Sequence, residues 1–207
     1  MESTSLAEQE RVVASDWGGG KSPFGTSWSK FMMWIFIISD ALTFAGLLIA
    51  YGFMRAISPS WPVQTEVFSM VLITFMTFVL ISSSAVMAMA VGAARAGDAK
   101  AAVKYMALTI VGGAIFLGCQ AYEWSHFIAE GARLDHNKFG VPQFAASFYV
   151  ITGFHGFHVL SGLTILAIVA IRAAMGKYSA TSVENAGLYW HFVDVVWVFV
   201  FAFFYLL

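Results

Sequence analysis

Seven ionisable side chains lie inside long apolar stretches of this sequence, where a charge is costly and usually marks function. They are Asp40, Glu123, His126, His155, His158, His191 and Asp194. All except Asp40 occur in pairs three residues apart, so both members of a pair lie on one face of a helix. Carboxyl and imidazole groups in this arrangement can bind a metal or haem, relay protons, or hold neighbouring helices together.

Metal or haem binding is the first alternative. Two histidines three residues apart on one helix can bind a metal together with carboxylates. Transmembrane haem, however, is usually held by one histidine from each of two facing helices, whereas His155 and His158 stand on the same expected helix. No Cys or Met completes a copper site, and the single cysteine, Cys119, lies in an apolar run as a small packing residue would. We therefore expect no catalytic, cofactor-binding or metal-binding residue in this chain.

Depth in the membrane bears on the other two alternatives, a proton relay and a set of contacts between helices. At 1.5 Å per residue Asp40 lies roughly 15 Å deep, where His158 and Asp194 come within its reach. We expect a buried polar layer and, separate from it, an outer polar pair made by Glu123 and His126. The buried polar layer consists of Asp40, His155, His158, His191 and Asp194. The gap between the two sets disfavours a continuous relay, so we interpret them as contacts that hold the bundle, with Asp40 bonded to His158.

Lipid is the solvent that the composition predicts for most of the chain. Of its 207 residues 59% are hydrophobic and 11% are charged, whereas a soluble domain carries about 25% charged residues. Five stretches are long enough to span a bilayer: residues 31–54, 67–93, 103–128, 144–171 and 188–207. The net charge of −1 argues against a nucleic-acid partner. The sequence predicts an all-α integral membrane bundle of five transmembrane helices, residues 30–207, after a polar cytoplasmic tail, residues 1–29.

Lysine and arginine predict the orientation of this bundle. Eight of them lie in the tail and in the second and fourth connections, and three lie on the opposite side. Because these residues accumulate on the cytoplasmic side of membrane proteins, we expect a cytoplasmic N-terminus and a periplasmic C-terminus. The sequence has neither inverted halves nor paired broken helices, so an independent proton or ion transporter is the weaker alternative.

Four segments of this sequence resemble segments of subunit III of the heme-copper oxidases, the respiratory terminal oxidases. They are residues 38–44 (ISDALTF), 120–124 (QAYEW), 152–159 (TGFHGFHV) with Gly162, and 189–197 (YWHFVDVVW). They occur in the family's order, and the resemblance covers about residues 30–207. Mitochondrial members begin with additional spans, so this chain resembles the short bacterial five-span form.

This resemblance implies an accessory role in an enzyme complex. In the family, haem and copper belong to subunits I and II, which reduce O₂ to water and pump protons, and subunit III holds neither. Subunit III packs against subunit I, binds phospholipid and supports proton uptake and resistance to inactivation during turnover. Arg172 matches a family arginine at a lipid headgroup, and its guanidinium is suited to phosphate contact. Glu184 also matches a family position, where we expect a structural role.

The resemblance also implies a place and partners. We expect a multi-pass protein of the bacterial inner membrane, assembled with oxidase subunits I and II and with phospholipid, and open to a larger respiratory supercomplex. Asp40, where the family often has Glu, is similar to the ubiquinol oxidase branch. Residues 120–123 and 189–191 are more similar to the cytochrome c oxidase branch, which we favour, with ubiquinol oxidase as the alternative.

Overall fold

The computed structural model describes residues 26–133 and 140–206, and all regular structure in this part of the chain is helical. The elements are α2 (Trp28–Ile57), α3 (Gln64–Val67), α4 (Met70–Arg95), α5 (Ala99–Ala129), α6 (Pro142–Ala174), α7 (Ala180–Val200) and the π-helix η1 (Phe201–Leu206). Residues 1–25 of the expected tail lie outside the described residues, and its last two residues already belong to α2.

Five helices in the described residues are long and apolar enough to cross a membrane, which confirms the five expected spans. Most helix ends extend beyond the expected apolar stretches because their polar residues stay helical, whereas α4 begins at Met70 and not at residue 67. Lys100 and Lys104 lie in the first turns of α5, and Glu184 lies in the first turns of α7. The short α3 follows Pro62 and was not expected from hydropathy, since four residues carry no periodic signal.

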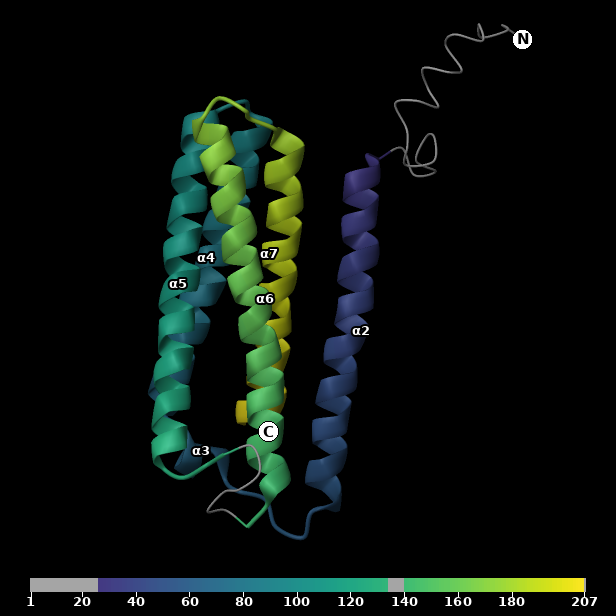
Figure 1. Cartoon of the computed structure of the whole chain (residues 1–207), viewed down its shortest axis with the longest axis vertical. Coiled ribbons are helices and arrows are strands. Elements are labelled where there is room, and N and C mark those ends of the chain that lie inside the picture. The colour runs from purple at the N-terminus through teal and green to yellow at the C-terminus, as the bar shows by residue number, and fades with distance from the viewer. Residues whose placement is uncertain (1–25, 134–139, 207) are drawn as a thin grey trace, which may run out of the picture.

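Short capped turns join the helices. The Asp98 side chain accepts a hydrogen bond from the backbone N–H of Ala101 at 3.0 Å and so caps α5. Gly97, just before it, has φ of 77°, a conformation that a residue without a Cβ adopts at low cost. Such tight turns make consecutive long helices antiparallel, so α3 lies at one end of the bundle (Figure 1). We call this end the α3 end, and the opposite end, where α7 begins, the Glu184 end.

Helices α4, α5, α6 and α7 form a closely packed group, and α2 packs mainly on α7 and less on α6 (Figure 1). Trp190 of α7 lies at the centre of the group and is only 1% exposed. Its indole N–H donates to Ser83 Oγ of α4 at 3.2 Å. Its ring lies against the backbone of Gly113 and Gly162, which have no side chain to obstruct it. One tryptophan therefore contacts three neighbouring helices.

Aromatic rings fill the bundle near the α3 end. The cluster consists of Phe68, Phe127, Phe144, Phe148 and Phe204, whose ring centroids lie 4.8–6.3 Å apart in the pairs that touch. Such contacts add to the free energy of burial. The π-helix η1 ends the last span and turns Tyr205 into the interior, where it is 1% exposed.

Candidate functional site

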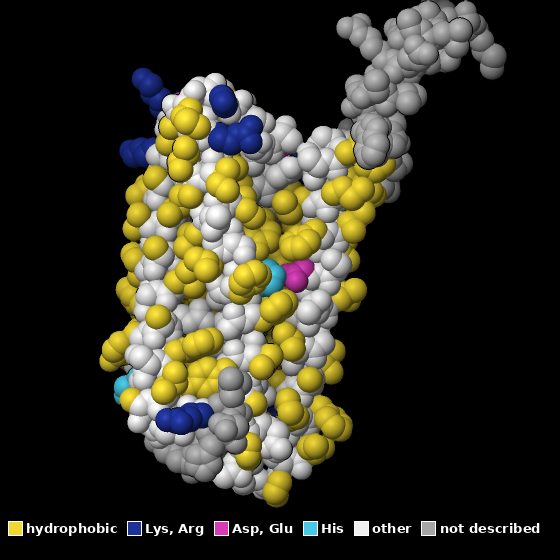
Figure 2. Space-filling model, in the orientation of Figure 1, with side chains coloured by type: hydrophobic (Ala, Val, Ile, Leu, Met, Phe, Trp, Pro, Cys, Tyr) yellow, Lys and Arg dark blue, Asp and Glu magenta, His cyan; other side chains and the backbone are white. Residues whose placement is uncertain are grey.

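Asp40 of α2 and His158 of α6 form a pair in the middle of the bundle. Asp40 Oδ2 lies 3.1 Å from His158 Nε2, and the two side chains are 11% and 7% exposed. This is the separation of an ion pair, although Oδ2 makes no hydrogen bond of regular geometry. The contact that depth counting predicted is therefore present. Figure 2 shows an acidic side chain beside a histidine at mid-height of an otherwise mostly apolar face.

The second ring nitrogen of His158 limits the protonation of this pair. His158 Nδ1 lies 2.8 Å from the carbonyl oxygen of Phe154, which can only accept, so Nδ1 carries a hydrogen. One further proton can then lie either on His158 Nε2 or on Asp40. In both forms the pair is neutral as a whole, which is the arrangement that a low-dielectric interior favours. The geometry thus leaves room for one shared proton between the two side chains.

His155 occupies a different environment, one turn away on α6. It is fully buried, and neither of its ring nitrogens has a hydrogen-bond partner. Its ring centroid lies 4.9 Å from that of Trp197 and 5.6 Å from that of Phe116. The imidazole thus packs as an aromatic ring between α5 and α7.

His191 and Asp194 of α7 are directed toward α4. His191 Nδ1 lies 2.6 Å from Ser84 Oγ. The Asp194 carboxyl lies near the same hydroxyl, and its Oδ1 is buried without a hydrogen-bond partner. The face of α7 toward α2 is apolar and carries Phe192 and Val195. We expected Asp194 to meet Asp40, but the structure divides the buried polar layer into two groups, and His155 belongs to neither. One group joins α2 to α6, and the other joins α7 to α4.

The outer polar pair is also divided. Glu123 is 6% exposed, and its Oε2 accepts a hydrogen bond from the Tyr205 hydroxyl at 3.1 Å. The His126 side chain is 61% exposed and lies 3.5 Å from Glu130 through Nδ1 and Oε1. The two residues thus bind different partners, although both line one small cavity. Sequence reasoning missed Tyr205, because a π-helix shifts the side-chain register.

Glu184 proves to be the centre of an ion-pair cluster at the Glu184 end. Its Oε2 lies 2.8 Å from Lys30 Nζ of α2, and its Oε1 lies 2.7 Å from Arg95 Nε of α4. The cluster therefore joins α2, α4 and α7. Its sequence signal is an acid at an end of the bundle that is rich in Lys and Arg.

Arg172 lies at the same end, beside a small cavity of about 60 Å³. Lys177 lines the cavity too, as do the hydroxyl-bearing Ser179 and Ser182 at the start of α7. Two cations and two hydroxyls form a polar recess that suits an anionic oxygen.

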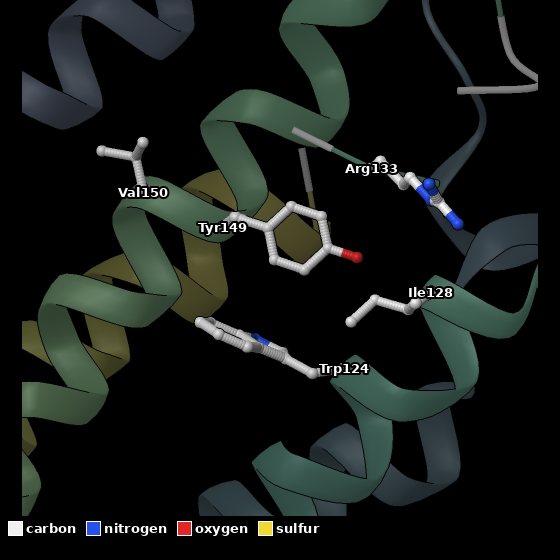
Figure 3. A pocket seen from close by; sticks show the side chains of 5 residues that line it. All are labelled: Trp124, Ile128, Arg133, Tyr149 and Val150. Carbon is white, nitrogen blue, oxygen red and sulfur yellow. The ribbon is translucent and has the colours of Figure 1, made fainter. Parts of the chain in front are cut away.

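A larger cavity of about 570 Å³ opens between α5 and α6 near the α3 end (Figure 3). Its lining consists of Trp124, Ile128, Arg133, Tyr149 and Val150. The Trp124 indole N–H donates to Thr152 Oγ1 at 3.1 Å, and the Tyr149 hydroxyl donates to a backbone carbonyl at 2.8 Å. Because these polar atoms are already bonded, the two rings offer apolar faces to the cavity, as an acyl chain requires. Among the described residues, no group of three or more His, Cys, Asp or Glu is placed to hold a metal ion.

Comparison with known proteins agrees with this architecture. Residues 9–207 match the family model described as cytochrome c oxidase subunit III. The cytochrome c oxidase subunit 3 of Synechocystis sp. is 39% identical over 84% of this chain and 73% of the relative. That of Thermostichus vulcanus is 38% identical over 84% of both chains. The quinol oxidase subunit 3 of Bacillus spizizenii is 32% identical, again over 84% of both chains.

The match extends over nearly the whole sequence and includes all five membrane helices. The relatives are bacterial proteins, and their names cover oxidases of two electron donors. The chain belongs to the cytochrome c oxidase subunit III family and is a multi-pass bacterial membrane protein, subunit III of a multi-subunit heme-copper oxidase.

Proposed function

We propose that this chain is the non-redox subunit of a proton-pumping cytochrome c oxidase, in which it stabilises subunit I, holds phospholipid and supports proton uptake. The observation that carries the proposal is the Asp40–His158 pair, which holds one exchangeable proton in the middle of the bundle. A group of this kind can take up a proton and pass it on: the pair is neutral while it holds the proton and carries one negative charge after release. The redox centres, haem and copper, belong to subunits I and II in this proposal.

The location of the pair supports a role toward a neighbouring subunit. Asp40 lies about 18 Å from the start of α2 at 1.5 Å per residue, near the midplane of a bilayer. Close to it, α2 and α7 border a groove of about 480 Å³ lined by apolar side chains such as Phe44 and Phe199. The groove suits an acyl chain, and the Arg172 recess suits a phosphate group.

The charges support a cytoplasmic location for the Glu184 end, in the bacterial inner membrane. On the face that Figure 2 shows, most Lys and Arg side chains lie at the Glu184 end. At this end Arg95 is the last residue of α4, Lys100 lies in the first turn of α5, and Arg172 lies in the last turn of α6. By the positive-inside rule this end faces the cytoplasm, and the α3 end faces the periplasm. Subunits I and II are the partners, and a respiratory supercomplex is a further level of assembly.

Cytochrome c is the proposed electron donor, because the relatives from Synechocystis sp. and Thermostichus vulcanus bear the name of cytochrome c oxidase and are more similar to this chain than the quinol oxidase relative. A ubiquinol oxidase is the second candidate, favoured by the 32% identity to that relative. The same purified oxidase distinguishes the two, since only one of the two reduced donors sustains its O₂ consumption.

The test is Asp40→Asn in the assembled oxidase, with Ser39→Ala as the matched control. The Ser39 hydroxyl only bonds its own helix, at the carbonyl of Phe36. We expect Asp40→Asn to lower O₂ consumption at alkaline pH, where protons are scarce, and to shorten the time to inactivation. The haem absorbance should stay unchanged, because this chain holds no haem. Equal rates and equal durability for the two variants across the pH range would refute the proposal.

A further inference from the structure

Glu123 lines a cavity near the α3 end of the bundle, here called the Glu123 cavity. Glu123 is 6% exposed, and Tyr205 occupies its Oε2. Its Oε1 is buried and has no hydrogen-bond partner. Buried polar atoms almost always have a partner, and this carboxyl lines a cavity of about 160 Å³. The free oxygen and the space beside it indicate a ligand that donates hydrogen bonds.

The walls of the cavity favour a cation of organic type. The described residues that line it are Val67, Phe68, Ser69, Leu72, Tyr122, Glu123, His126 and Phe127, and none of these is Lys or Arg. Aromatic side chains attract cations through their π faces, and a carboxylate adds a full negative charge. A hard metal ion needs several oxygen ligands and prefers carboxylates and carbonyls, whereas the side chains of the described lining offer one carboxyl and the hydroxyls of Ser69 and Tyr122. His126 is turned toward Glu130.

The volume of the cavity and its depth in the membrane limit which cations can bind there. The cavity equals roughly five water volumes of 30 Å³ each, enough for an ammonium group on a two-carbon arm. Helix α5 has 31 residues, so it is about 46 Å long and spans the headgroup regions as well as the hydrocarbon. Glu123 lies six residues before the end of α5, about 9 Å below it. That depth is the boundary between headgroups and hydrocarbon.

We propose that the Glu123 cavity binds a primary ammonium group, which donates to Glu123 Oε1. Two sources share this chemistry: the ethanolamine headgroup of a phospholipid in the leaflet at the α3 end, and a small soluble amine. The site is separate from the Asp40–His158 pair and from the Arg172 recess, and it takes the opposite charge from the latter.

The test uses the whole purified oxidase in lipid nanodiscs and three variants. Glu123→Gln removes the charge, and Ser69→Leu fills the cavity while leaving the carboxyl and Tyr205 in place. Ser69 makes no side-chain cap bond to α4, so its replacement removes no capping hydrogen bond. Glu130→Gln is the matched control, because it removes an acid at the same end that does not line the cavity.

Native mass spectrometry of complexes from nanodiscs of phosphatidylethanolamine and phosphatidylglycerol is the first measurement. The unaltered oxidase and Glu130→Gln should retain one more phosphatidylethanolamine than Glu123→Gln and Ser69→Leu do. In nanodiscs of phosphatidylcholine and phosphatidylglycerol, ethylammonium chloride should raise the melting temperature of the unaltered oxidase and not that of Glu123→Gln. A response only in this second arm identifies the soluble amine as the source.

Two results would overturn the proposal. The first is equal retention of phosphatidylethanolamine by all four proteins together with no response to ethylammonium, which would leave the cavity to water. The second is loss of the lipid from Glu130→Gln as well, which would show general attraction to an acidic end. If Glu123→Gln fails to assemble, Ser69→Leu decides the question alone, since it keeps the carboxyl.

Discussion

Gly113→Ala should be among the most damaging single-methyl additions to this protein. A Cβ at Gly113 would collide with the Trp190 ring and would lie 2.7 Å from Leu163 Cδ2. Leu163 can rotate away, but the indole cannot, because it is held on the other side by the backbone of Gly162. The indole N–H is also bonded to Ser83 at 3.2 Å. Insertion of the methyl group must therefore move a helix.

The expected cost follows from this geometry. Overpacking a close-packed interior by one methylene costs about 1–3 kcal/mol. Gly118→Ala on the same helix is the matched control, since a Cβ there meets nothing within 4 Å. Removing a glycine from a helix interior stabilises it by up to about 1 kcal/mol. Because both variants gain this stabilisation, they should differ by the overpacking cost alone, about 2 kcal/mol, or roughly 30-fold in the unfolding equilibrium.

SDS titration of the micellar subunit, followed by tryptophan fluorescence, measures this difference. Gly113→Ala should unfold at a lower SDS fraction than the unaltered chain, and Gly118→Ala at the same or a higher one. Trp190→Phe should destabilise the Gly113→Ala variant less than it destabilises the unaltered chain, because the smaller ring leaves room for the added methyl group. Equal midpoints for the two alanine variants would refute the claim that Trp190 leaves no space at Gly113.

Two further substitutions test contacts between helices. Glu184→Gln removes the ion pairs to Lys30 and Arg95, which lie near water. We expect the free energy of unfolding to fall by about 1 kcal/mol at low salt and by nothing in high salt. A difference in SDS midpoint between the two proteins that is the same at every salt concentration would contradict this. Trp197→Phe removes the indole N–H that donates to Thr77 Oγ1 at 2.9 Å. We expect the free energy of unfolding to fall by about 1–2 kcal/mol at every salt concentration in the same titration. An unchanged midpoint would show that this hydrogen bond contributes nothing.

The spans and one contact could be predicted from the sequence because both depend on length along a helix. Apolar runs of bilayer length predicted the five spans, and the constant rise per residue placed Asp40 level with His158 on an antiparallel helix. The rotation of α7 could not be predicted in this way. A helix in the interior of a membrane bundle is apolar nearly all round, so no hydrophobic face indicates that Asp194 is turned toward Ser84 and α4.

The partners of Glu123 and Glu184 depend on the ends of helices, where sequence patterns are weakest. Tyr205 reaches Glu123 because the last turn of the chain widens into a π-helix, and no residue pattern announced that change. Lys30 and Glu184 are 154 residues apart in the sequence and meet only because α7 packs beside α2. Each contact needs the complete packing of the bundle before it exists.

The loose packing of α2 has a consequence for the order of synthesis. Its contacts are with α7 and α6, and the partner of Lys30 is made 154 residues later. At roughly 5–20 residues per second, α2 remains in lipid for about 8–30 s before Glu184 emerges from the ribosome. Until His158 is made, 118 residues after Asp40, Asp40 has no histidine beside it. Helix α2 is therefore among the last helices to be secured, and a chain that stops before α7 holds it by its contacts with α6 alone.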